Sequence, residues 1–130
     1  MTRTTLLALA SRVEAATGAD RELDIDIALA TIPHLFRSEY GGVVYDNEAV
    51  CRKHDPNHRR YIYDTPRYTA SLDAAMSLVP SGYAMGFKRA PCQRSHAMLA
   101  TIGEEYNASG ATTALAMTAV CLRAIAGSME

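Results

Sequence analysis

The chain lacks several features that would place it in a specialised class of protein. Its 130 residues include no tryptophan and only three cysteines, an odd number that implies no disulfide framework. The formal net charge of −1 excludes a histone-like protein that binds through a large excess of one charge sign. No apolar run approaches the roughly 18 residues of a membrane span. We therefore expect a cytoplasmic protein of a bacterial host, with enough apolar residues (48%) to build a core.

The common motifs of catalysis are also missing. We find no glycine-rich phosphate loop, dinucleotide fingerprint, nucleophile elbow or two-histidine zinc helix. Ser, His and Asp all occur, but no spacing pairs a nucleophile with its base. Four carboxylates could form an acid–base set: Asp20, Glu22, Asp24 and Asp26. Asp24 and Asp26 point to opposite sides of a helix, however, which favours a solvated face. We expect neither enzymatic activity nor a cofactor.

Charge is distributed unevenly along the chain. Residues 1–50 hold four arginines against eight acidic residues, whereas residues 51–100 hold eight basic residues against three aspartates. Such a contrast predicts one acidic and one basic face, and it bears on partners rather than on the fold.

Hydrophobic periodicity predicts four helices. The first follows Thr4 or Thr5 and ends at Gly18, and the second is capped by Asp20 and closed by Pro33. A third is expected over 69–79, with Thr69 as its N-cap. The last, over 112–126, has one charged residue and is expected to be buried. Five of its side chains could instead form a dimer seam, although core packing is the favoured interpretation: Leu115, Thr118, Cys121, Leu122 and Ile125.

Two apolar stretches, 83–87 and 97–102, are typical of strands and predict an antiparallel hairpin joined by the loop 88–96. Shorter strands are expected at 43–45 and 61–63. The predicted fold class is α+β, with helices packed on a small antiparallel sheet in a two- or three-layer sandwich. We expect a single domain over 1–130, in which the less regular segment 34–65 is a candidate insertion.

Three segments together carry a family resemblance. The first segment is Arg21-Glu22-Leu23-Asp24, followed by the apolar residues 27–30. The second runs from Tyr68 to Met76 and continues to Val79-Pro80-Ser81-Gly82-Tyr83. The third runs from Ala114-Leu115-Ala116 to Leu122-Arg123-Ala124. Over residues 1–32 and 66–126 the chain resembles the phage ABA-sandwich domain family of small phage and prophage proteins. It departs from that pattern in having Tyr83 where tryptophan is common. The resemblance implies a phage origin and an α+β fold, and it brings no catalytic residues.

The segment 51–68 has the composition of a binding surface. Its cations alternate with tyrosines, which suits both a protein interface and a nucleic-acid patch, and it could also neutralise the acidic N-terminal half. The predicted contact residues are Arg52, Lys53, Arg59, Arg60, Tyr61, Tyr63 and Arg67, with Tyr68 beside them.

One pattern resembles a metal site. Cys51-x2-His54-x3-His58 and Cys92-x3-His96 could supply zinc ligands if the two loops met. The neighbouring cations would repel a metal ion, so we expect solvated histidines and unpaired thiols instead, with no metal bound.

The sequence therefore predicts a small phage accessory protein that binds a host machine stoichiometrically. A CRISPR or other defence complex is the expected target, which would make the protein an anti-CRISPR-type inhibitor. The alternative is a nucleic-acid-binding module that uses segment 51–68. No membrane partner is expected, and the protein could be a monomer or a homodimer.

Overall fold

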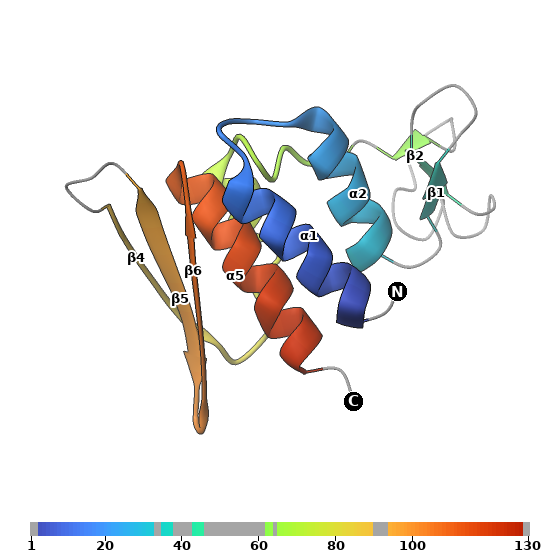
Figure 1. Ribbon diagram of the computed structural model, residues 1–130. Coiled ribbons are helices and arrows are strands. Elements are labelled where there is room, and N and C mark those ends of the chain that lie inside the picture. The colour runs from blue at the N-terminus through green and yellow to red at the C-terminus, as the bar shows by residue number, and fades with distance from the viewer. Residues whose placement is uncertain are drawn as a thin grey trace.

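The structure is a computed structural model that describes residues 3–32, 35–37, 43–45, 62–63, 65–89 and 94–128. Helices α5 and α1 pack on the antiparallel sheet β4-β5-β6, while α4 packs against α5 and α2 against α1. A second small sheet is formed by β1, β2 and β3. Figure 1 shows the larger sheet nearly edge-on, with α5 along one face, α1 next to α5, and α2 beyond α1. The predicted α+β class is confirmed. No described helix has both the length and the apolar character needed to cross a membrane.

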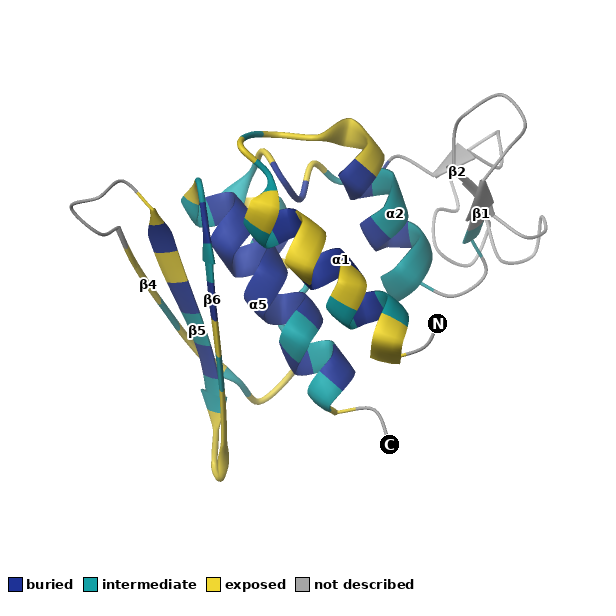
Figure 2. Cartoon of the chain, in the orientation of Figure 1, coloured by how far each residue is buried: buried dark blue, intermediate teal, exposed yellow. Residues whose placement is uncertain are grey.

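Helix α5 (Thr113–Gly127) is the centre of the fold. Most of its residues are buried on all sides because α1, α4 and the sheet surround it (Figure 2). Thr112 is its N-cap and accepts a hydrogen bond from the Leu115 N–H at 3.2 Å. The expected burial is confirmed. Of the residues considered for a dimer seam, Leu115, Cys121 and Leu122 lie in the core, Ile125 packs against it, and Thr118 is fully buried.

Helix α1 (Arg3–Ala15) packs along α5 through the predicted apolar stripe. The residues buried in that contact are Leu6, Leu9, Ala10 and Val13. The helix was expected to continue to Gly18, but it ends at Ala15, so Thr17 lies beyond it and is exposed. Leu9 and its neighbours therefore join the single hydrophobic core of the described residues.

Helix α2 (Arg21–Thr31) begins as predicted at Asp20, whose carboxylate accepts hydrogen bonds from the N–H groups of Glu22 and Leu23. The expectation that Asp24 lies on a solvated face is wrong, since only 2% of it is exposed. Its carboxylate accepts two 2.8 Å hydrogen bonds, from the backbone N–H and from the hydroxyl of Thr69.

Arg21 completes this buried cluster. Its guanidinium lies 3.2 Å from Asp24 Oδ2 and donates a 2.7 Å hydrogen bond to the Thr65 carbonyl oxygen. Asp24 is buried because it ties α2 to the segment that enters α4, a pairing between residues 45 positions apart that helical spacing alone does not reveal. The other aspartate, Asp26, is partly exposed and pairs with Arg12 at 3.1 Å.

Helix α4 (Leu72–Met76) is shorter than predicted. Ser71 caps it, accepting from the Ala74 N–H at 3.2 Å, while Thr69 faces Asp24 instead. The helix ends before Val79 because Pro80 disfavours helical backbone in the residue that precedes it.

The larger sheet consists of β4 (Ala84–Arg89), β5 (Ser95–Thr101) and β6 (Glu104–Gly110). The predicted hairpin of β4 and β5 is confirmed, with Gly86 opposite Met98. The third strand, β6, was not predicted, and it pairs with β5 across a tight turn in which Gly103 has a φ of +90°. The small sheet contains the predicted β2 (Val43–Tyr45) and β3 (Ile62–Tyr63), together with β1 (Leu35–Arg37), which was not predicted.

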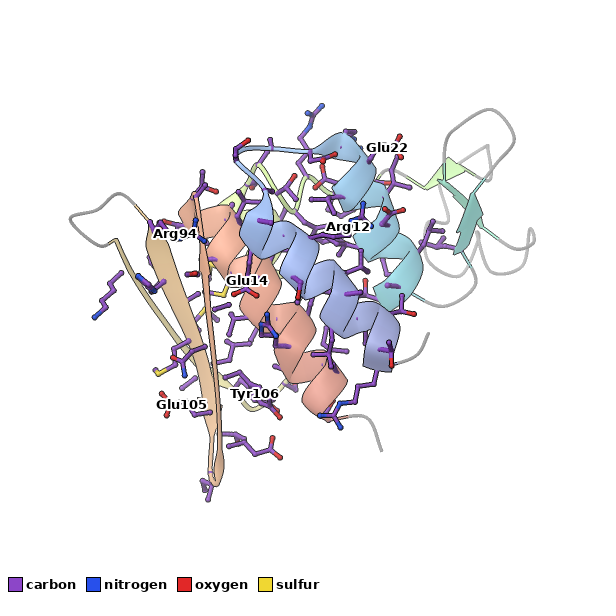
Figure 3. The ribbon with its side chains drawn as sticks, in the orientation of Figure 1. Arg12, Glu14, Glu22, Arg94, Glu105 and Tyr106 are labelled. Atoms are coloured by element: carbon purple, nitrogen blue, oxygen red, sulfur yellow. The ribbon has the colours of Figure 1, made fainter. Side chains whose placement is uncertain are left out.

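The open edge of β6 is covered by the end of α1. Glu14 accepts a 3.4 Å hydrogen bond from the Ser109 N–H and forms an ion pair with Arg123 of α5. Arg94 donates to both the Ser109 hydroxyl and the Glu14 carbonyl oxygen at 3.2 Å, and Figure 3 shows it beside Glu14. The contact with Glu14 satisfies the Ser109 N–H, a backbone group on the edge of β6 that faces away from β5.

Candidate functional site

Most of the predicted binding surface cannot be placed. Arg52, Lys53, Arg59, Arg60 and Tyr61 lie outside the described residues, and Tyr63 is described only as backbone of β3. Arg67 is exposed, as expected of a contact residue. Tyr68 is not part of such a surface, because it is 2% exposed and its carbonyl oxygen accepts a 2.9 Å hydrogen bond from Thr118 in the core.

The candidate zinc ligands Cys51, His54, His58 and Cys92 also lie outside the part of the chain that the structure describes. His96 is exposed on β5. Within the described residues, no three His, Cys, Asp or Glu side chains come together as metal ligands.

Alternation along the strands divides the larger sheet into two faces. The helix-facing side of its central strand, β5, contains the buried residues Ser95, Ala97 and Leu99. The opposite side, here called the outer face, is covered by none of the described helices (Figures 1 and 2). The strand register places nine side-chain positions on it, in three rows: Lys88, His96 and Ser109; Gly86, Met98 and Asn107; Ala84, Ala100 and Glu105. Figure 3 shows Glu105 pointing away from the helices and Tyr106 pointing toward them.

The outer face has one large apolar side chain, Met98, at its centre and charged side chains toward its two ends. Met98 stands in the middle, next to Gly86, whose missing side chain leaves room for the Met98 methyl group. Lys88 and His96 lie at one end of the face and Glu105 at the other. An apolar centre with a polar rim of both charge signs is the usual anatomy of a protein–protein interface.

A shallow hollow of about 320 Å³ lies on this face. Its walls include the side chains of Lys88, His96, Met98 and Asn107, and Gly86 contributes its backbone. A cation, an imidazole and an amide therefore surround an apolar floor, where they can pair with acidic and carbonyl groups of a partner.

The tight turn between β5 and β6 is held by two phenols. Tyr83 and Tyr106 both donate hydrogen bonds to Glu104 Oε2, at 3.3 and 3.2 Å, and their ring centroids lie 6.3 Å apart. Partial burial, followed by the negative charge of Glu104, raises the pKa of both phenols. Both phenols are protonated at neutral pH and can donate these hydrogen bonds.

Cys121 is a core residue. Burial raises the pKa of its thiol to about 12, and the sulfur lies 3.8 Å from the Ala75 carbonyl oxygen. Since the thiolate is the reactive form, Cys121 should react with dithionitrobenzoate at pH 8 at least about 10³-fold more slowly in the folded protein than in urea. The measurement uses a Cys51→Ser/Cys92→Ser background, so that Cys121 is the remaining thiol. Rapid labelling of the folded protein would contradict the buried placement.

Sequence reasoning missed the outer face because it missed β6. The stretch 104–110 is rich in Glu, Asn, Ser and Gly, which are poor strand formers. A weak signal was present in the alternation of Tyr106, Ala108 and Gly110 with Glu105, Asn107 and Ser109.

Comparison with known proteins adds no relative. No protein-family model, curated protein or solved structure matches the chain.

Proposed function

We propose that the protein acts by stoichiometric binding to a host protein complex, as a small accessory protein of phage or prophage type, and that the outer face contacts the partner. The observation that carries this proposal is the sheet face that none of the described helices covers, with Met98 at its centre and polar side chains at its rim. Methionine is adaptable and polarizable, and it recurs at binding surfaces for that reason.

The chemistry of the outer face favours protein over nucleic acid as the partner. Sheets that bind single-stranded nucleic acid stack bases on aromatic side chains, and none of the nine outer-face positions is aromatic. Its charges are Lys88 and Glu105, with a histidine beside the lysine, so it lacks the row of cations that follows a phosphate backbone.

A host defence complex, such as a CRISPR effector, is the target we propose. The phage resemblance of the sequence supports this choice, because a small phage protein can block such a complex by binding alone. The expected consequence is inhibition without chemical change of the target.

The proposal is tested by a substitution that places a charge at the centre of the outer face. Met98→Glu should lower the recovery of the host partner in pull-downs at least about tenfold, since buried interface anchors account for most of the binding energy. It should also abolish protection of phage from CRISPR interference in a plaque assay. Ala8→Glu, at an exposed position of α1, is the matched control and should bind like the wild type.

Wild-type behaviour of Met98→Glu, with its circular dichroism spectrum unchanged, would exclude the outer face. The nucleic-acid alternative is favoured by the basic composition of segment 51–68 and predicts a different result. DNA affinity would fall steeply between about 50 and 200 mM salt, and Arg59→Glu/Arg60→Glu would abolish it.

A further inference from the structure

Strand β4 is an edge strand whose exposed apolar residues have no described cover. Among the strands that the structure describes, it pairs with β5 alone. On the helix-facing side of the sheet, Met85 and Phe87 follow the same alternation as the buried Leu99 and Ala97, yet they are 40% and 51% exposed. The reason is that α5 lies mainly over β5 and β6 and barely reaches β4.

The hydrogen-bond pattern shows which backbone groups of β4 point to its open edge. In β6, the Ser109 N–H points away from β5 and donates to Glu14. Because backbone groups alternate in direction along a strand, the N–H and C=O groups of Ala108 point toward β5 and exchange hydrogen bonds with Ala97. By the same alternation in β5, the N–H and C=O groups of Met98, the residue after Ala97, point toward β4 and pair with Gly86. It follows that the N–H and C=O groups of Met85 and Phe87 point toward the open edge.

We propose that a second copy of this chain occupies that edge, so that two β4 strands pair antiparallel about a two-fold axis at Gly86 and form a continuous six-stranded sheet. In this register, Met85 of each chain lies opposite Phe87 of the other, and these are the residues whose backbone groups point outward. The Gly86 residues of the two chains lie opposite each other as a non-hydrogen-bonded pair, in which the Cα atoms are closer together than in a hydrogen-bonded pair.

The strand is self-complementary in this register. Each Met85 gains a contact between sulfur and the ring of a Phe87, and these four apolar side chains cover one another between the two α5 helices. Lys88 lies opposite Ala84, so the pairing sets no two cations against each other. A two-fold interface made from one strand needs only a patch that matches itself, and this register supplies one.

The first test measures the mass of the full-length protein by analytical ultracentrifugation. We expect a concentration-dependent dimer, and Phe87→Glu should raise its dissociation constant at least about tenfold by placing a carboxylate in the apolar contact. Ile102→Glu is the matched control, because Ile102 is a fully exposed apolar residue at the turn between β5 and β6 and should leave the dimer unchanged. A monomeric mass from about 1 µM to about 1 mM would overturn the proposal.

The second test fixes the register and does not depend on weakening the fold. In the Cys51→Ser/Cys92→Ser background, Gly86→Cys should form a disulfide-linked dimer under mild oxidation, because the two Cα atoms would be about 4.5 Å apart. A side chain is tolerated there, since an added Cβ would meet only the Met98 methyl group at 3.6 Å. Ala84→Cys, which lies opposite Lys88, should stay unlinked.

A dimer that resists Phe87→Glu, or that cross-links through Ala84→Cys instead of Gly86→Cys, would also overturn this pairing. The inference is independent of the proposed function. A monomer would leave the outer face free to bind its target, and loss of host binding in Met98→Glu would leave the dimer intact.

Discussion

Asp24→Ala is expected to lower the free energy of unfolding by about 3 kcal/mol, because it removes the common acceptor of a buried cluster. The Thr69 N–H and hydroxyl both donate to Asp24 at 2.8 Å, and Thr69 is 1% exposed. Without the carboxylate the Thr69 N–H is left without an acceptor in the core, and such a group costs about 1–3 kcal/mol. Arg21 is affected less, since 44% of its side chain is exposed to water.

Urea denaturation at constant m-value measures this loss. Asp26→Ala is the matched control on the same helix, because its ion pair with the exposed Arg12 is worth less than about 1 kcal/mol. Asp24→Asn keeps one acceptor oxygen and should fall between the two. Equal losses for the two alanine variants would show that Asp24 contributes no more than a surface carboxylate.

Gly110→Ala should be comparably damaging, with a loss of about 2–4 kcal/mol from steric overlap. Gly110 ends β6 directly before α5, and a Cβ added there would lie 2.7 Å from the Ala116 backbone nitrogen and 3.0 Å from Leu115. Both contacts belong to the first turn of the central helix, which is packed on all sides and cannot move away. The sheet and the helix would have to separate.

Thermal unfolding followed by circular dichroism tests this expectation. Gly18→Ala is the control, because an added Cβ at Gly18 meets nothing within 4 Å and reduces the freedom of the unfolded chain. It should therefore be neutral or slightly stabilising. A Gly110→Ala protein as stable as the Gly18→Ala protein would mean that the approach of β6 to α5 is looser than described.

The two proposed surfaces lie on the same sheet and fit together. Pairing of two β4 strands would place the two outer faces side by side on the same surface of the six-stranded sheet. The reason is that the two-fold axis is perpendicular to the sheet. A host complex with repeated subunits would then be bound at two points, which raises the apparent affinity without any new contact. The dimer variant Phe87→Glu should weaken such binding while leaving the nine side chains of each outer face in place, although residue 87 borders the hollow on that face.

Local patterns in the sequence were enough to predict the helices and one hairpin. The stripe around Leu9, the cap at Asp20 and the apolar run over 112–126 depend on spacing within one segment, which is why they are confirmed. The cap predicted at Thr69 was wrong because its hydroxyl is engaged by Asp24, a residue 45 positions away. Segment 51–60 stays a prediction, as it lies outside the described residues.

The amino-acid sequence by itself determined where helices form and which of their faces are apolar. It also determined that the helices pack on a small antiparallel sheet. These properties follow from residues that are neighbours in the sequence. Only the tertiary structure decided that Glu105, Asn107 and Ser109 belong to a strand, and that Met98 lies at the centre of an open face. The physical reason is that a weak strand former becomes a strand when β5 offers it a ladder of hydrogen bonds and α5 covers its other side. Exposure of Met85 and Phe87 was decided in the same way, by how far one helix reaches across three strands.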